Sequence, residues 1–128
     1  MNIWAGQRLS LATLATIENV IKYGADCDLL VHEVAIAAPE LMKEAYVQRV
    51  MAHHTTAREA DQVFARTKPK LAAYTHLVFI ASPTIPAMTV HDLVTETRKT
   101  YGGPLQVGED LMSVDIGDSI EVLLHSAG

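Results

Sequence analysis

An apolar run of eleven residues, KLAAYTHLVFI at positions 70–80, constrains the fold more than any other feature of this sequence. Its apolar residues do not alternate with polar ones, so we expect a strand that is buried on both faces. A second apolar run of strand length, CDLLVHEV, occupies positions 27–34 and ends before the small residues of AIAAP. Strands of this kind belong to parallel sheets that helices cover. The sequence therefore predicts an α/β fold.

Helix signals alternate with these two strands. The expected starts are an N-cap at Ser10 with a stop at Gly24, Pro39 as the first residue of a helix over 39–52, a capping box from Thr56 to Glu59, and another from Thr89 to Asp92. Beyond the break at residues 102–104, Gly117-Asp118 predicts a hairpin turn between two short strands. We therefore expect a mainly parallel sheet followed by a small antiparallel element.

Composition limits the classes of protein to consider. The chain has 128 residues, 49% of them hydrophobic, which suits one domain with a real core. A net charge of -5 argues against coating nucleic acid or an anionic membrane through bulk charge, although it leaves a local nucleic-acid site open. Cys27 is the single cysteine, which excludes an intramolecular disulfide. No apolar stretch approaches the roughly 20 residues that span a bilayer, so we expect a cytoplasmic protein that does not enter membranes.

Six histidines, at positions 32, 53, 54, 76, 91 and 125, are the unusual part of the composition. Three groups of them fall near element boundaries: His32-Glu33, His53-His54 and His76. Because functional residues gather at the carboxyl ends of parallel strands, these groups are expected to converge on one edge of the sheet. Ordinary roles compete with this interpretation: a satisfied core histidine at 76, a polar strand exit at 32–33 and a solvated turn at 53–54.

Taken in order, the strings CDLLVHEV, AHHTTAREADQVFARTKPK and LAAYTHLV resemble the C-terminal half of metallo-β-lactamase-fold hydrolases. The resemblance is to the branch that includes ribonuclease Z and arylsulfatase-like enzymes, and it covers about residues 18–123. It implies half of an αββα sandwich, with a mixed sheet and helices on one face. Residues 1–128 would then form a single truncated domain of this fold.

The resemblance also implies roles for particular residues. His76 matches the histidine of a Thr-His motif that binds one of two catalytic metal ions, usually zinc. His54 matches a histidine that contacts the scissile phosphate, and Glu33 matches the acidic residue that orients it, with His32 beside it. A carboxylate that fixes the tautomer of an imidazole is consistent with these roles. The implied activity is metal-dependent hydrolysis of phosphodiesters or sulfate esters.

Two departures qualify this activity. The family's main metal-binding signature, H-x-H-x-D-H, is absent from the sequence, and so is its bridging aspartate. We therefore expect the isolated chain to be inactive, and a single His76 to hold no zinc alone. A lone half would expose the sheet face that normally packs on its partner, which predicts a homo-oligomer or a complementary N-terminal half. The alternative is a non-catalytic, oligomeric binding or structural half-domain.

Overall fold

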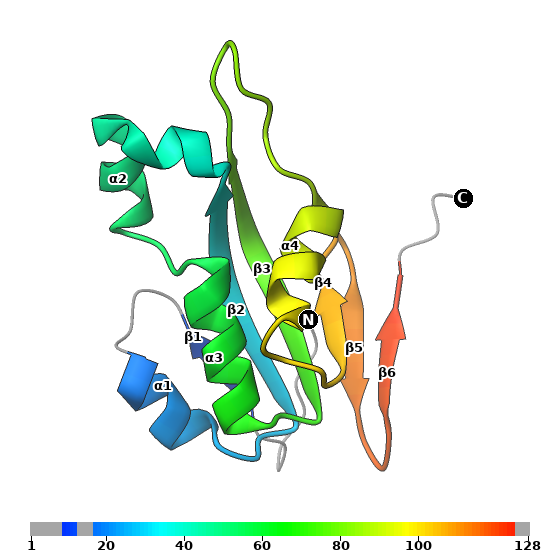
Figure 1. Ribbon diagram of the computed structural model, residues 1–128. Coiled ribbons are helices and arrows are strands. Elements are labelled where there is room, and N and C mark those ends of the chain that lie inside the picture. Colours follow the sequence, from blue (N-terminus) through cyan, green and yellow to red (C-terminus); the bar gives the residue numbers. More distant parts are fainter. Residues whose placement is uncertain (1–8, 13–16, 125–128) are drawn as a thin grey trace.

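The computed structural model describes residues 9–12 and 17–124, which form two sheets and a set of helices (Figure 1). The main sheet has the order β1-β2-β3-β4, and all its neighbouring strands are parallel. Its strands are β1 (Leu9–Ala12), β2 (Leu29–Ala37), β3 (Leu71–Ile80) and β4 (Leu105–Val107). The hairpin of β5 (Ser113–Ile116) and β6 (Ile120–Leu123) forms a separate antiparallel sheet. The predicted α/β class, with its parallel sheet and terminal antiparallel pair, is confirmed.

The helices follow their capping signals where those signals are complete. They are α1 (Ile17–Gly24), the 3-10 helix η1 (Pro39–Lys43), α2 (Ala45–Met51), α3 (Ala57–Thr67) and α4 (Val90–Arg98). Thr56 and Thr89 both form the predicted capping boxes, in which the hydroxyl and the carboxylate three residues later satisfy backbone amides. The side chain at each helix start thus fixes where α3 and α4 begin.

Three predicted boundaries are wrong. Ser10 lies in β1 rather than capping a helix, because the apolar residues around it pair with β2. The helix expected over 39–52 is divided at Glu44, whose backbone is extended. β2 continues through the small residues to Ala37, because β3 pairs with it that far. In β1 and at the end of β2, pairing with a neighbouring strand overrides local propensity.

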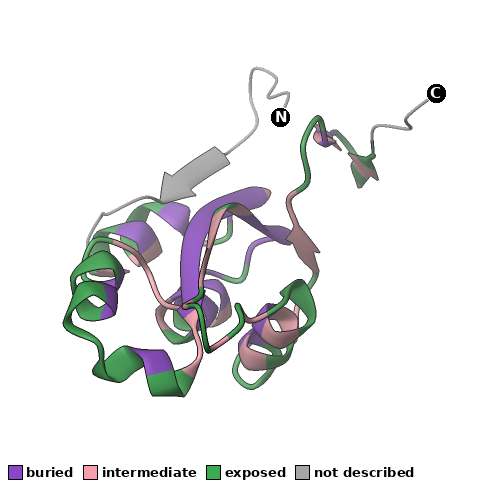
Figure 2. Ribbon diagram, turned by 90° about the horizontal axis from the view of Figure 1, so that it is seen from above, coloured by how far each residue is buried: buried purple, intermediate pink, exposed green. Residues whose placement is uncertain are grey.

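Helices α1, α3 and α4 pack on one face of the main sheet (Figure 2), whereas η1 and α2 form a separate cluster with Ala35 near the end of β2. On that face Leu30 and Val34 of β2 and Tyr74 of β3 meet Phe64 of α3 and Leu93 of α4 in one buried cluster. Tyr74 donates or accepts a hydrogen bond at 2.8 Å to the hydroxyl of Thr97 within this core. The helix-covered face is therefore the larger part of the core, and it holds β2 and β3 rigidly.

The opposite face is partly covered by the chain's own hairpin. Leu29 and Val31 of β2, with Leu71 of β3, cluster against Val114 and Ile116 of β5. The resemblance predicted that this face of the sheet is exposed. The hairpin instead covers the part of the face that the amino-terminal halves of β2 and β3 form. Oligomerisation through the rest of that face remains a prediction.

A β-bulge interrupts the pairing of β2 with β3. Glu33 pairs with Thr75, but Val34 pairs with Leu77, so His76 is an extra residue without a partner in β2. His76 has a φ of 47°. Residues other than glycine rarely adopt this left-handed backbone conformation. It costs about 1–3 kcal/mol, which the surrounding structure must offset. Bulges of this kind redirect side chains and are frequent beside functional sites.

Candidate functional site

Glu33 is the anchor of the candidate site. It lies within β2, four residues before the strand ends, and only 1% of its surface is exposed. One carboxylate oxygen, Oε1, accepts the backbone N–H of Thr55 at 2.6 Å. The other, Oε2, lies 3.1 Å from Nδ1 of His54. A buried carboxylate is tolerated only when its oxygens are paired, and each oxygen of Glu33 has a partner.

The segment before α3 brings His54 to Glu33. The backbone N–H of Ala35 donates to the carbonyl of Thr55 at 2.8 Å, and Thr56 forms an isolated bridge with Ala35. The segment therefore runs alongside β2 before Thr56 caps α3. This attachment leaves 22% of the His54 side chain exposed. Because Oε2 of Glu33 is an acceptor, it selects the tautomer of His54 that carries its proton on Nδ1, and Nε2 remains available to a ligand.

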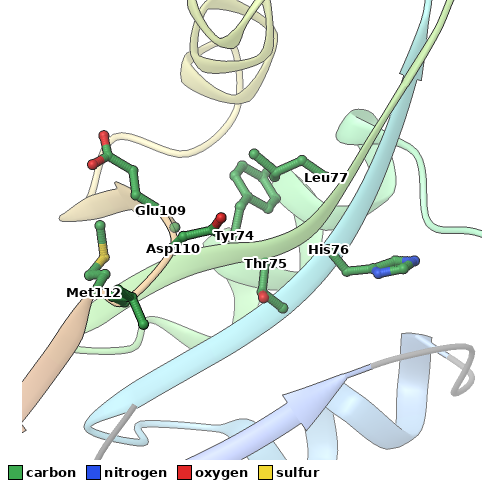
Figure 3. A pocket seen from close by; sticks show the side chains of 9 residues that line it. Tyr74, Thr75, His76, Leu77, Glu109, Asp110 and Met112 are labelled. Carbon is green, nitrogen blue, oxygen red and sulfur yellow. The ribbon is translucent and has the colours of Figure 1, made fainter. Parts of the chain in front are cut away.

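His76 completes the cluster from β3. Its ring and the ring of His54 are stacked, with centroids 5.8 Å apart and planes inclined by 25°. Figure 3 shows Thr75 and His76 on the same side of β3, with Tyr74 and Leu77 on the other. Consecutive side chains of a regular strand alternate between faces. The bulge is therefore what turns His76 toward His54 and Glu33.

The other histidines do not join this cluster. His32 is buried on the helix face, edge-on to Phe64, and its Nδ1 lies 2.6 Å from the carbonyl of Glu33. Burial lowers the pKa of His32, which favours the neutral imidazole. His53 and His91 are exposed. His125 lies outside the described residues. The structure thus brings together Glu33, His54 and His76, and places His32 on the other side of β2.

A cavity of about 620 Å³ lies beside the β3 bulge, between β3 and the segment that follows β4. It is lined by residues 74–77 and 108–112 (Figure 3). The carboxylate side chains of Glu109 and Asp110 lie on its far wall from His76, whose imidazole points away from them (Figure 3). The cavity therefore adjoins the bulged part of β3 that carries His76.

A zinc site is not complete within the described residues. Over residues 9–12 and 17–124, no three side chains of His, Cys, Asp or Glu lie together as a metal-binding group. Structural and catalytic zinc ions take at least three protein ligands. His76 presents one imidazole, and Nδ1 of His54 already faces Glu33. The residues present thus do not fit a resident zinc ion by themselves.

The fold itself has solved counterparts. One is the crystal structure of the metallo-beta-lactamase fold protein YhfI from Bacillus subtilis, with a TM-score of 0.57 and 20% sequence identity. The match covers 81% of this chain and 38% of that protein, so the chain spans well under half of its length. Neither a scan against protein-family models nor a search of curated proteins found a match. The chain therefore has part of the metallo-β-lactamase fold.

Two parts of the site carry no sequence signal. The Thr55 amide that binds Glu33 is a backbone group, so the type of residue at position 55 does not indicate it. The bulge at His76 depends on pairing with β2 and lies within an unbroken apolar run.

Among the described residues no helix is long and apolar enough to cross a membrane.

Proposed function

We propose that this chain carries the proton-transfer part of a hydrolase site that acts on phosphodiesters or sulfate esters. The observation that carries the proposal is the pair formed by buried Glu33 and partly exposed His54, joined at 3.1 Å through Nδ1. A carboxylate that holds one imidazole nitrogen so that the other faces solvent is a recurrent arrangement for general acid–base catalysis. The partial metallo-β-lactamase fold supports the same class of reaction.

Glu33 has two tasks in this proposal. It fixes the ring of His54 in one orientation and one tautomer, and its negative charge stabilises the imidazolium form. Its second oxygen is occupied by the Thr55 amide, so the carboxylate cannot rotate away from His54 without leaving that amide unpaired. Glu33 is thus a positioning residue, because it acts on substrate through His54.

His54 is the residue that meets the ester. After it takes a second proton from solvent, the His54 imidazolium donates a hydrogen bond from Nε2 to an oxygen of the tetrahedral phosphate or sulfate group. As the bond between phosphorus or sulfur and the leaving oxygen breaks, the imidazolium gives its Nε2 proton to that oxygen. Water supplies the incoming oxygen, and its excess proton passes to solvent. Positioned general acids of this kind contribute about 10²- to 10⁴-fold to rates.

His76 lies beside this imidazole and is the residue with which this chain would contribute to a metal site. Zinc, when bound in enzymes of this fold, supplies an activated water and a Lewis acid. The remaining ligands would have to come from outside the described residues, from a complementary polypeptide segment or a further chain. The proposal therefore assigns to this chain ester binding and proton transfer, with little turnover when it acts alone.

The binding of phenyl phosphate and phenyl sulfate tests this proposal. We expect saturable binding to the wild-type chain, weakened about 10- to 100-fold by His54→Ala, because a charge-assisted hydrogen bond contributes about 1.5–3 kcal/mol. His53→Ala is the matched control, since this neighbouring histidine is exposed. Equal affinity in wild type and His54→Ala would contradict the proposal. Absence of any saturable binding would instead favour the non-catalytic half-domain.

A further inference from the structure

Gly108, the residue that follows β4, lies where the main sheet ends on the β4 side. The register of β3 with β4 runs from Ala72–Leu105 to Tyr74–Val107. The backbone N–H of Gly108 then donates to the carbonyl of Tyr74 at 2.8 Å. Tyr74 stands two residues before His76, so this hydrogen bond is made just before β3 enters the bulge.

The approach of Gly108 to β3 leaves no room for a side chain. A Cβ atom at position 108 would lie 2.5 Å from the carbonyl oxygen of Tyr74 and 3.9 Å from the Cα atom of Thr75. The first separation is far inside van der Waals contact, and the atom it meets belongs to the backbone of β3. The strand cannot yield as a flexible side chain would, so any larger residue must push β3 and residue 108 apart.

The bulge is held from both edges of β3. On one edge β2 pairs with β3 before and after His76, up to Thr75 and again from Leu77. On the other edge the Gly108 hydrogen bond fixes Tyr74. The left-handed backbone of His76 persists because its surroundings determine it from these two sides.

We propose that Gly108 is a positioning residue for the stacked imidazoles of His54 and His76. Its amide and its lack of a Cβ hold Tyr74 at the distance that sets the bulge, and the bulge turns His76 onto His54. A role of Gly108 in catalysis rests on the proposed function. The geometry itself is independent of whether the chain hydrolyses an ester.

The test compares Gly108→Ala with Gly102→Ala by NMR of the histidine rings. Gly102 precedes β4 at its opposite end, and a Cβ there would meet nothing within 4 Å. Wild type and Gly102→Ala should show a nuclear Overhauser contact between the rings of His54 and His76. Gly108→Ala should lose that contact while the far-UV circular dichroism stays unchanged. Retention of the contact in Gly108→Ala would overturn the proposal.

A second measurement needs no variant and covers the case in which Gly108→Ala does not fold. In the wild-type chain, subdenaturing urea should release the Gly108 amide to hydrogen exchange at the same concentration at which the contact between the rings disappears. An inter-ring contact that survives after the Gly108 amide exchanges freely would overturn the proposal. Failure of His54→Ala to alter ester binding would refute the proposed function and leave this result standing.

Discussion

Replacing Glu33 by glutamine should reverse the tautomer of His54. The amide has one oxygen acceptor, whereas the carboxylate uses two oxygens, one for the Thr55 amide at 2.6 Å and one for Nδ1 of His54 at 3.1 Å. Leaving a buried amide unpaired costs about 1–3 kcal/mol, and even for the partly buried Thr55 amide this cost should keep the glutamine oxygen on Thr55. Its NH₂ group then faces Nδ1, which can only accept, and the ring proton moves to Nε2.

The energetic consequence follows from these contacts. A hydrogen bond to a charged group contributes about 1.5–3 kcal/mol and a neutral one about 1 kcal/mol, so the contact between residue 33 and Nδ1 of His54 should weaken by roughly 1–2 kcal/mol. The stability of the fold should change less, because the substitution also removes the cost of burying a charge. In the proposed reaction the imidazolium gives its Nε2 proton to the leaving oxygen, and in the variant that imidazolium would set its Nδ1–H against the glutamine NH₂, so acid–base catalysis should fall by about 10²-fold or more.

Nitrogen-15 NMR of the histidine rings at neutral pH measures the tautomer of His54 directly. In wild type we expect the protonated nitrogen of neutral His54 to be Nδ1, and in Glu33→Gln it should be Nε2. Glu109→Gln, which removes an exposed carboxylate on the far wall of the cavity, should leave His54 as in wild type. An unchanged tautomer in Glu33→Gln would refute the argument that the carboxylate fixes the ring.

Three further substitutions test the surroundings of the site, each by urea denaturation. Thr56→Ala removes the cap of α3 and should lower the free energy of unfolding by about 1 kcal/mol. Asp61→Asn should raise it by about 1 kcal/mol at pH 7, because Oδ1 of Asp61 is buried without a hydrogen-bond partner. Burial raises the pKa of Asp61, so this gain should shrink as falling pH protonates the wild-type carboxyl. Burial lowers the pKa of His32 below 6.5, so the unfolded chain binds the proton more readily. Wild-type stability should therefore decline as pH falls through 6.5, and His32→Gln should flatten that part of the profile.

Specific results would contradict each of these expectations. A Thr56→Ala variant as stable as wild type would mean that attachment of its segment to β2, rather than the cap, sets the start of α3. A loss of stability in Asp61→Asn at pH 7 would show that the backbone hydrogen bond from Gln62 and the charge of Arg58, both of which lower the pKa of Asp61, outweigh desolvation. An unchanged slope in His32→Gln between pH 7 and pH 5.5 would place the titration in another group.

Most of the fold could be predicted from the sequence because the signals that determine it are local. The apolar run at 70–80 and the capping boxes at Thr56 and Thr89 act through neighbours in the chain, and the strand and both helices lie where these signals predict. Ser10 failed as a helix signal because pairing with β2, a tertiary contact, decides the conformation of its segment. Local conformational propensity does not reflect such tertiary contacts.

The candidate site was predictable in its residue types but not in its geometry. The resemblance pointed to Glu33, His54 and His76, and the structure places these three together. It pointed equally to His32, whose ring lies on the opposite face of β2 against Phe64, because adjacent residues of a strand alternate between faces. The bulge that turns His76 toward His54 arises from register alone, and its support at Gly108 depends on a close approach between two strands.

The central claim is that Glu33 holds His54 so that Nε2 faces the oxygen of an ester. Its most direct test is a scalar coupling across that hydrogen bond, between nitrogen-15 of the histidine ring and phosphorus-31 of bound phenyl phosphate. We predict a coupling at Nε2 of His54 and none at Nδ1, which stays on Glu33. A saturated complex in which Nε2 of His54 shows no coupling or shift, while another histidine does, would contradict the account.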